Sequence, residues 1–379
     1  MRFFSAPLAL LLSSLAVCHG KYVMHAYYLD KSCEVVRTTL ETWMKNAADT
    51  ADAALKAQAF AVEKCINNPP EEHGPVCEAI YMLIKSLLAF RGQEPRDFII
   101  SGKWDDMQRR LQRAKAWDVK RDGTAFPLDP SEDPGSRGQP ENKAGRFSKF
   151  TYTNMVFYCD YTRLMDGISC DGGSVQGKAC DTSIGRDVDM DNRYTECRDS
   201  RQTPSQMSTW VRIPPLPMPE GGSRPNPYGI VSPNQVLGPI QIQFCPGYMA
   251  DATGLDQYKV LEDGRKVLAN ARIERPGQKA AVEYAMLGDG RLLHALLRTY
   301  TPSNGGKAVA YKDDHIALTW ADVIKLDDVD KWASASTVAF FAVGAKLLFP
   351  PQDKTPLTID PTRGTVVKLR SRKASDKTE

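Results

Sequence analysis

Apolar residues recur at intervals of three and four positions in five segments of the chain, and this period predicts amphipathic or buried helices. The first segment is Ala-rich, contains neither Gly nor Pro, and is followed by Pro69 and Pro70, which end it. The last segment is apolar almost all round, so we expect it to be buried. The five expected helices cover about 32–64, 76–90, 104–117, 289–300 and 333–348.

Two further segments are typical of β-strands. Residues Phe150–Tyr158 alternate aromatic, β-branched and polar side chains and end at Cys159, and the short run Ile240–Phe244 ends at Cys245. Between them, the Gly- and Asp-rich region 170–197 has little periodicity, and we expect an irregular excursion held by disulfides. These elements predict an α+β fold that is rich in helices and contains a small sheet.

The composition changes along the chain and suggests five segments. Arg2 and an apolar run that ends at Val17 resemble an export signal, and the run is too short to cross a bilayer. We expect cleavage near Gly20. The predicted organisation is a signal peptide at 1–20, a helical N-terminal region at 21–121, a linker at 122–149, a second domain at 150–349 and a disordered tail at 350–379.

Nine cysteines are encoded, and Cys18 leaves with the signal peptide. The even number that remains favours four disulfides, an oxidising compartment and a secreted, extracellular protein. Cys33 and Cys65 lie at opposite ends of the first predicted helix, roughly 48 Å apart, and cannot bond to each other. Cys65 and Cys77 flank the turn after that helix, and we predict that they pair. The eight cysteines are Cys33, Cys65, Cys77, Cys159, Cys170, Cys180, Cys197 and Cys245.

Charge and hydropathy add little about partners. The net charge is +3 with both signs well mixed, which does not point to nucleic acid as a partner. After the signal peptide no stretch approaches the roughly 18 apolar residues of a membrane helix, so we expect no membrane span. We expect a monomer whose partner is an extracellular protein or peptide.

The segment Leu293-His294-Ala295-Leu296-Leu297-Arg298 carries the most informative chemistry. In a zinc peptidase, two histidines at positions i and i+4 of a helix hold the metal. A glutamate directly after the first histidine takes a proton from the metal-bound water. His294 stands in the first histidine position, Ala295 in the glutamate position and Arg298 in the second histidine position. A single histidine on a Leu-rich helix is more often a packed, hydrogen-bonded residue than a metal ligand, so this helix alone is a weak signal for a zinc site.

In order along the chain, a strand ending at Cys159, a strand ending at Cys245, the His294 helix, the pair Asp313-Asp314 and a small-residue-rich closing helix resemble the aspzincin zinc metalloendopeptidases. That group includes the deuterolysins and the peptidyl-Lys endopeptidases. The resemblance covers about 151–348 and is best over 240–348. It implies a zincin-like metallopeptidase fold, a fungal source, and zinc as the cofactor of an active member.

The resemblance also shows what this chain lacks. It maps the zinc ligands onto His294 and onto Asp313 or Asp314, while Ala295 removes the general base and Arg298 removes the second histidine. It therefore implies an inactive homologue without a cofactor, in which Arg298 pairs with Asp313 or Asp314 where zinc once lay. The alternative is an active zinc endopeptidase with a rearranged site made of His294, His315 and Asp313 or Asp314.

The 170–197 region suggests one further function and contains one motif that resembles a metal site. A partner-binding site in this region is a third hypothesis for the function. The pattern Asp187-x-Asp189-x-Asp191 resembles the start of a calcium loop, but Asn192 and Arg198 stand where Gly and Glu are needed. We therefore interpret these carboxylates as an acidic turn without metal.

Overall fold

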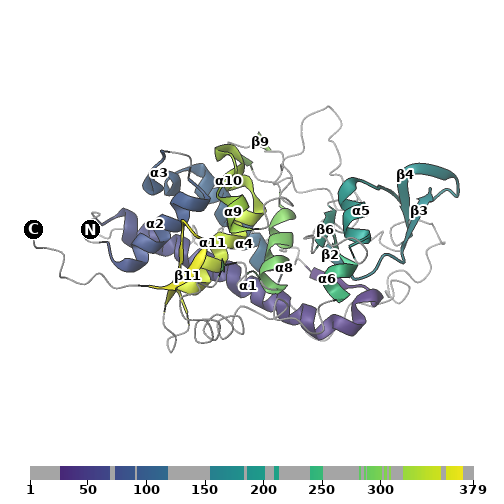
Figure 1. Cartoon of the computed structure of the whole chain (residues 1–379), viewed down its shortest axis with the longest axis horizontal. Coiled ribbons are helices and arrows are strands. Elements are labelled where there is room, and N and C mark those ends of the chain that lie inside the picture. The colour runs from purple at the N-terminus through teal and green to yellow at the C-terminus, as the bar shows by residue number, and fades with distance from the viewer. Residues whose placement is uncertain are drawn as a thin grey trace, which may run out of the picture.

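Helices from both halves of the chain form one body. A smaller lobe with a three-stranded sheet projects from one end of this body, at the right of Figure 1. A computed structural model describes residues 26–68, 73–89, 92–117, 154–182, 186–200, 209–212, 240–250, 281–282, 286, 288–300, 303–304, 307–308, 319–350 and 356–369. The predicted signal peptide at 1–20 and the predicted linker at 122–149 lie outside the described residues.

The first predicted helix is confirmed and runs without a break through three helix types. It begins as the 3-10 helix η1 (Lys31–Val36), continues as α1 (Arg37–Phe60) and ends as the π-helix η2 (Ala61–Ile66). The Asp30 side chain caps its start by accepting from the amide of Ser32 at 2.9 Å. The apolar stripe predicted from the sequence is the buried face of α1, because these positions meet on one side of the helix.

Four further helices confirm the remaining predicted helical segments. They are α2 (Pro75–Leu87), α4 (Gly102–Ala116), α8 (Gly288–Arg298) and α11 (Ala335–Leu348). α4, α8 and α11 pack on α1, and α2 packs on α11. Shorter helices are α3 (Pro95–Ile99), α5 (Asn192–Arg198), α6 (Pro246–Ala250), α9 (Trp320–Val323) and α10 (Asp328–Ala333).

The apolar core does not respect the predicted boundary between 21–121 and 150–349. Leu40 and Trp43 of α1, Leu83 of α2 and Met107 of α4 belong to the same buried cluster as Phe340 of α11. α11 is buried along nearly its whole length and lies between helices of the N-terminal region. In the described residues, the helices of the predicted N-terminal region and those of the predicted second domain therefore share one core, because neither set covers its apolar faces alone.

A four-stranded sheet lies beside the helices, with the order β1-β2-β7-β6. Its strands are β1 (Ala26–Leu29), β2 (Asn154–Tyr158), β7 (Ile240–Phe244) and β6 (Thr209–Arg212). β1, β2 and β7 are parallel, and β6 is the antiparallel edge strand. Phe157 and Phe244 stack at 5.7 Å in the main core, while Gln241 and Gln243 form buried hydrogen bonds with lobe residues. Both predicted strands are thus confirmed.

The region predicted as an irregular excursion is an ordered lobe. Its strands β3 (Leu164–Ile168), β4 (Ser174–Asp181) and β5 (Arg186–Asp189) form an antiparallel sheet. β4 is mostly exposed over its first five residues, so its sequence lacks the alternation that marks a strand. The prediction was wrong for this reason. A second small core, which includes Leu164, Val188 and Tyr194, holds the lobe together.

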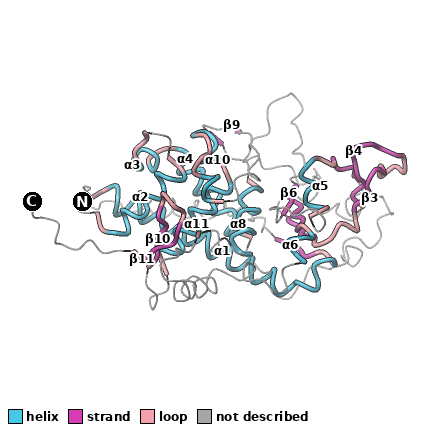
Figure 2. The backbone as a smooth tube through the Cα atoms, viewed as in Figure 1, coloured by secondary structure: helices cyan, strands magenta, loops and turns pink. Residues whose placement is uncertain are grey.

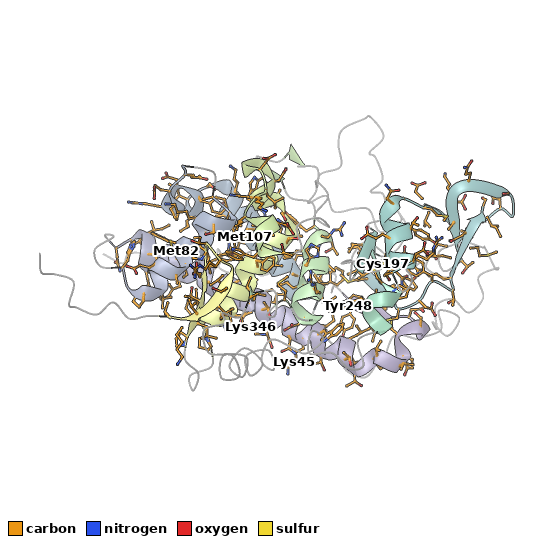
Figure 3. All side chains as sticks on the ribbon, in the orientation of Figure 1. Lys45, Met82, Met107, Cys197, Tyr248 and Lys346 are labelled. Carbon is orange, nitrogen blue, oxygen red and sulfur yellow. A yellow bond between two sulfur atoms is a disulfide. The ribbon has the colours of Figure 1, made fainter. Side chains whose placement is uncertain are left out.

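All eight mature cysteines form disulfides, as predicted. The pairs are Cys33–Cys159, Cys65–Cys77, Cys170–Cys180 and Cys197–Cys245. The predicted Cys65–Cys77 bond is confirmed. Cys197–Cys245 fastens the lobe to the end of β7, and Tyr248 lies at the same junction (Figure 3), where it packs against both cores.

Part of the predicted tail at 350–379 is ordered, so that prediction was wrong for the described part. β10 (Leu357–Asp360) and β11 (Thr365–Lys368) form an antiparallel hairpin. Ile359 and Val366 are buried and join the main core, which explains why this segment is held. A second short pair, β8 (Ser303–Asn304) and β9 (Lys307–Ala308), follows α8. Among the described helices, none combines the length and apolar character required to cross a membrane.

Candidate functional site

Helix α8 begins against an aromatic ring of α1. A Cβ atom on Gly288, its first residue, would lie 2.1 Å from Cε2 of Trp43, so this contact admits only glycine. The helix then packs on α1 and α11 in the middle of the body (Figure 2). Arg291, His294 and Arg298 follow at intervals of three and four residues and therefore share one face of α8.

His294 is 5% exposed, and within the described part of the chain its ring atom Nε2 has no hydrogen-bond partner. Burial lowers the pKa of His294 well below its usual value, and the positive charges of Arg298, Arg291 and Arg110 lower it further. The imidazole is therefore neutral at pH 7, with one ring nitrogen as a donor and the other as an acceptor. Each of these three charges disfavours a proton on the imidazole.

Helix α4 adds charged groups to the site from the N-terminal half of the chain. Arg110 is completely buried, and its Nη1 donates to the backbone carbonyl of Trp332 at 3.2 Å. Asp106, also completely buried, accepts from Arg109 and from the hydroxyl of Tyr300, each at 3.4 Å. This polar layer lies between α4 and α8, two helices that pack directly on each other.

Ala295, at the position predicted for the general base, is completely buried in the main core. Leu293, Leu296 and Leu297 on the same helix are equally buried. A methyl group at this position neither takes up nor releases a proton. The described part of α8 therefore offers one neutral imidazole and two guanidinium groups, and no carboxylate, on the face that would hold a metal.

The other predicted metal ligands, Asp313, Asp314 and His315, lie outside the described residues. Within the described part of the chain, one group of three metal-type side chains comes together, namely Cys170, Cys180 and Asp187. Its two cysteines form a disulfide with each other, so they carry no thiolate to bind a metal. His294 does not belong to this group.

The acidic pattern that resembles a calcium loop has a structural explanation. The Asp187 carboxylate accepts from the amide of Cys170 at 2.7 Å and from the hydroxyl of Ser169 at 2.9 Å. These hydrogen bonds lower the pKa of Asp187. Asp191 caps α5 by accepting from the amide of Tyr194 at 2.7 Å. Two of the three carboxylates therefore have local partners, which agrees with the interpretation as an acidic turn.

A second buried polar cluster joins the lobe to the four-stranded sheet. Nη1 of Arg163 donates to Oε1 of Gln243 at 2.5 Å, and its Nε lies 3.4 Å from the Asp181 carboxylate. Gln241 donates to the same carboxylate at 2.9 Å. The guanidinium group also lies 3.5 Å above the ring of Tyr158. Since every member comes from the lobe or the sheet, we interpret this cluster as a fastening between them.

Sequence reasoning missed Arg110, Arg291 and the Arg163 cluster. The spacing of Arg291, three residues before His294, could have identified it. No comparable signal exists for Arg110 or Arg163, because their neighbours come from distant segments of the chain. No family model matches the sequence, and searches of curated proteins and of solved structures found no similar protein.

Proposed function

We propose that the chain is a secreted, catalytically inactive homologue of the aspzincin metalloendopeptidases that binds an extracellular protein or peptide. The support is the order of its elements: β2 followed directly by Cys159, β7 followed directly by Cys245, then α8 with His294 and the buried closing helix α11. Four disulfides are compatible with an extracellular location.

The positive charges that act on His294, where a zinc site would have neutral or negative ligands, carry this proposal. A catalytic zinc site needs three protein ligands, and these are neutral or negatively charged. Here Arg298, Arg291 and Arg110 act on the imidazole, and arginine does not lose its charge in proteins. A zinc ion beside Nε2 would meet repulsion from all three groups, and this repulsion is strong in a buried, poorly screened site.

The loss of the general base acts independently of the metal. Removing such a group typically lowers the rate of an enzyme by about 10²–10⁴. Ala295 is buried among leucines, and the carboxylate of α8, Asp289, lies in the first turn of the helix, five residues before His294. Both losses together favour binding over hydrolysis.

The direct test is the zinc content of the intact chain, purified from a secreting host without added metal or chelator. We expect a value near zero, no peptidase activity, and a melting temperature that a chelator does not change. A value near one equivalent would overturn the proposal. It would support the alternative of an active endopeptidase that uses His294, His315 and Asp313 or Asp314.

A gain-of-binding experiment tests the homology. Arg298→His removes a positive charge and supplies the second histidine of the zinc pattern, so we expect measurable zinc uptake with Asp313 or Asp314 as the third ligand. The matched control is Arg291→His, which makes the same charge change about two turns before Arg298 and places the new histidine outside the i, i+4 spacing with His294. Equal uptake by both variants, or uptake by neither, would count against the homology.

A further inference from the structure

Arginines from two helices lie around His294, two on α8 and one on α4. Arg291 and Arg298 lie about one turn on either side of His294, and Arg110 approaches from α4. Each guanidinium group offers five N–H donors, so a group that already makes other contacts still contributes its charge and its remaining donors.

His294 itself contributes a polar atom without a hydrogen bond. Its Nε2 is buried and has no hydrogen-bond partner among the described residues, although buried polar atoms in proteins are nearly always hydrogen-bonded. A neutral imidazole that carries its proton on Nε2 donates from this atom. Because the surrounding charges are positive, the acceptor that best suits this donor is an anionic oxygen.

We propose that this face of α8 binds an oxyanion, either a carboxylate or a phosphate, which accepts a hydrogen bond from Nε2 of His294 and lies beside Arg298 and Arg291. The inference deepens the proposed function and rests on it, since the same positive field that excludes zinc attracts the anion. It names the chemical group through which a peptide or another extracellular partner would be recognised.

The burial of the four side chains indicates how the anion approaches. His294 and Arg110 are buried, whereas Arg291 and Arg298 are only half-buried and reach the surface. The anion therefore enters past the two arginines of α8 and meets the imidazole at the inner end. Arg110 donates to the carbonyl of Trp332 and contributes its charge from the side of α4.

The experiment is a titration of the intact, metal-free chain with inorganic phosphate and, separately, with an acetylated peptide that has a free terminal carboxylate. The amidated form of the same peptide is the control, and chloride keeps the ionic strength constant. Calorimetry and the histidine ring signals in NMR are recorded. We expect saturable binding of phosphate or of the free carboxylate, together with a shift of the His294 ring signals.

Matched variants locate the site. Arg298→Gln should weaken binding about tenfold or more, because a hydrogen bond to a charged group is lost. Arg298→Lys should retain part of the affinity. Arg37→Gln removes one positive charge at the first residue of α1, where Arg37 is 25% exposed and pairs with Glu34, and should leave binding unchanged. Binding by phosphate alone or by the carboxylate alone supports the inference and identifies the source of the oxyanion.

Three results would overturn the inference: no saturable binding of either probe, an equal loss of affinity in Arg298→Gln and Arg37→Gln, or binding without a shift of the His294 signals. These results are distinct from a failure of the proposed function. If the metal-free chain binds neither probe, only the oxyanion site is refuted. If the chain contains one equivalent of zinc, the proposal of an inactive homologue is refuted.

Discussion

Gly288 is a position where one added methyl group should lower stability. The Cβ atom of Gly288→Ala would overlap the indole of Trp43, which is completely buried and has little space to move. We expect a loss of about 1–3 kcal/mol in the free energy of unfolding, measured by chemical denaturation. Gly102→Ala is the matched control, because Gly102 also begins a helix but has open space around it. Equal stability of both variants would contradict the packing described for α8.

His294 gives the chain a defined dependence of stability on pH. Its pKa in the folded state is lowered, and in the unfolded chain it takes up a proton near pH 6.5. Between these values the unfolded state binds more protons, so the free energy of unfolding falls as the pH decreases from 6.5. His294 contributes at most about 1.4 kcal/mol per pH unit to the slope of the free energy of unfolding against pH, and this slope becomes small above pH 7. Denaturation of His294→Gln between pH 5 and 7 should show a shallower dependence, and an unchanged slope would contradict a buried neutral imidazole.

At this scale the sequence could identify His294, Ala295 and Arg298 as the residues of interest, because helical spacing alone places two of them on one face. It could not predict the sign of the site. That sign depends on Arg110, which lies in a helix distant in sequence and reaches His294 only through the packing of α4 on α8.

Among the connections between elements, the disulfides should differ in their contribution to stability according to the loop that each closes. Cys65–Cys77 joins residues 12 apart, and Cys33–Cys159 joins residues 126 apart. The chain-entropy model gives about 3 kcal/mol for the first and about 5 kcal/mol for the second. Replacing each pair by serine and measuring the free energy of unfolding should show the larger loss for Cys33–Cys159. The reverse order would show that strain or residual structure outweighs loop entropy.

The helices were the most predictable elements, since a long apolar stripe with helical spacing, as in α1, indicates a helix that packs on a core. The strands β2 and β7 were predictable because both of their faces are buried and their sequences are rich in apolar residues. The lobe was not predictable. Its strands are stabilised by backbone pairing, two disulfides and a core that includes Leu164, Val188 and Tyr194, and none of these features leaves a period in the sequence.

For the whole molecule, the shared core predicts that residues 150–379 do not fold without the N-terminal helices. α1, α2 and α4 supply a large part of the cluster in which α8 and α11 are buried, and β1 is one of the two edge strands of the sheet. We expect residues 150–379, produced alone, to show no cooperative thermal transition and little near-ultraviolet circular dichroism. The control is the full chain cut once within 122–149, whose two pieces stay joined by Cys33–Cys159 and should remain folded. Cooperative unfolding of 150–379 alone would restore the predicted domain boundary.

The length of α1 also bears on the order of events during synthesis. Cys33 emerges from the ribosome first, but its partner Cys159 follows Cys65 only after roughly 5–20 seconds of translation. During that interval Cys65 is the first cysteine that Cys33 could meet. α1 spans 24 residues, more than the roughly 12–15 below which isolated helices are marginal in water, and helices form within microseconds. Once formed, the helix holds the two thiols at opposite ends of a rigid rod, so we expect Cys65 to oxidise with Cys77 before the strand that carries Cys159 reaches Cys33.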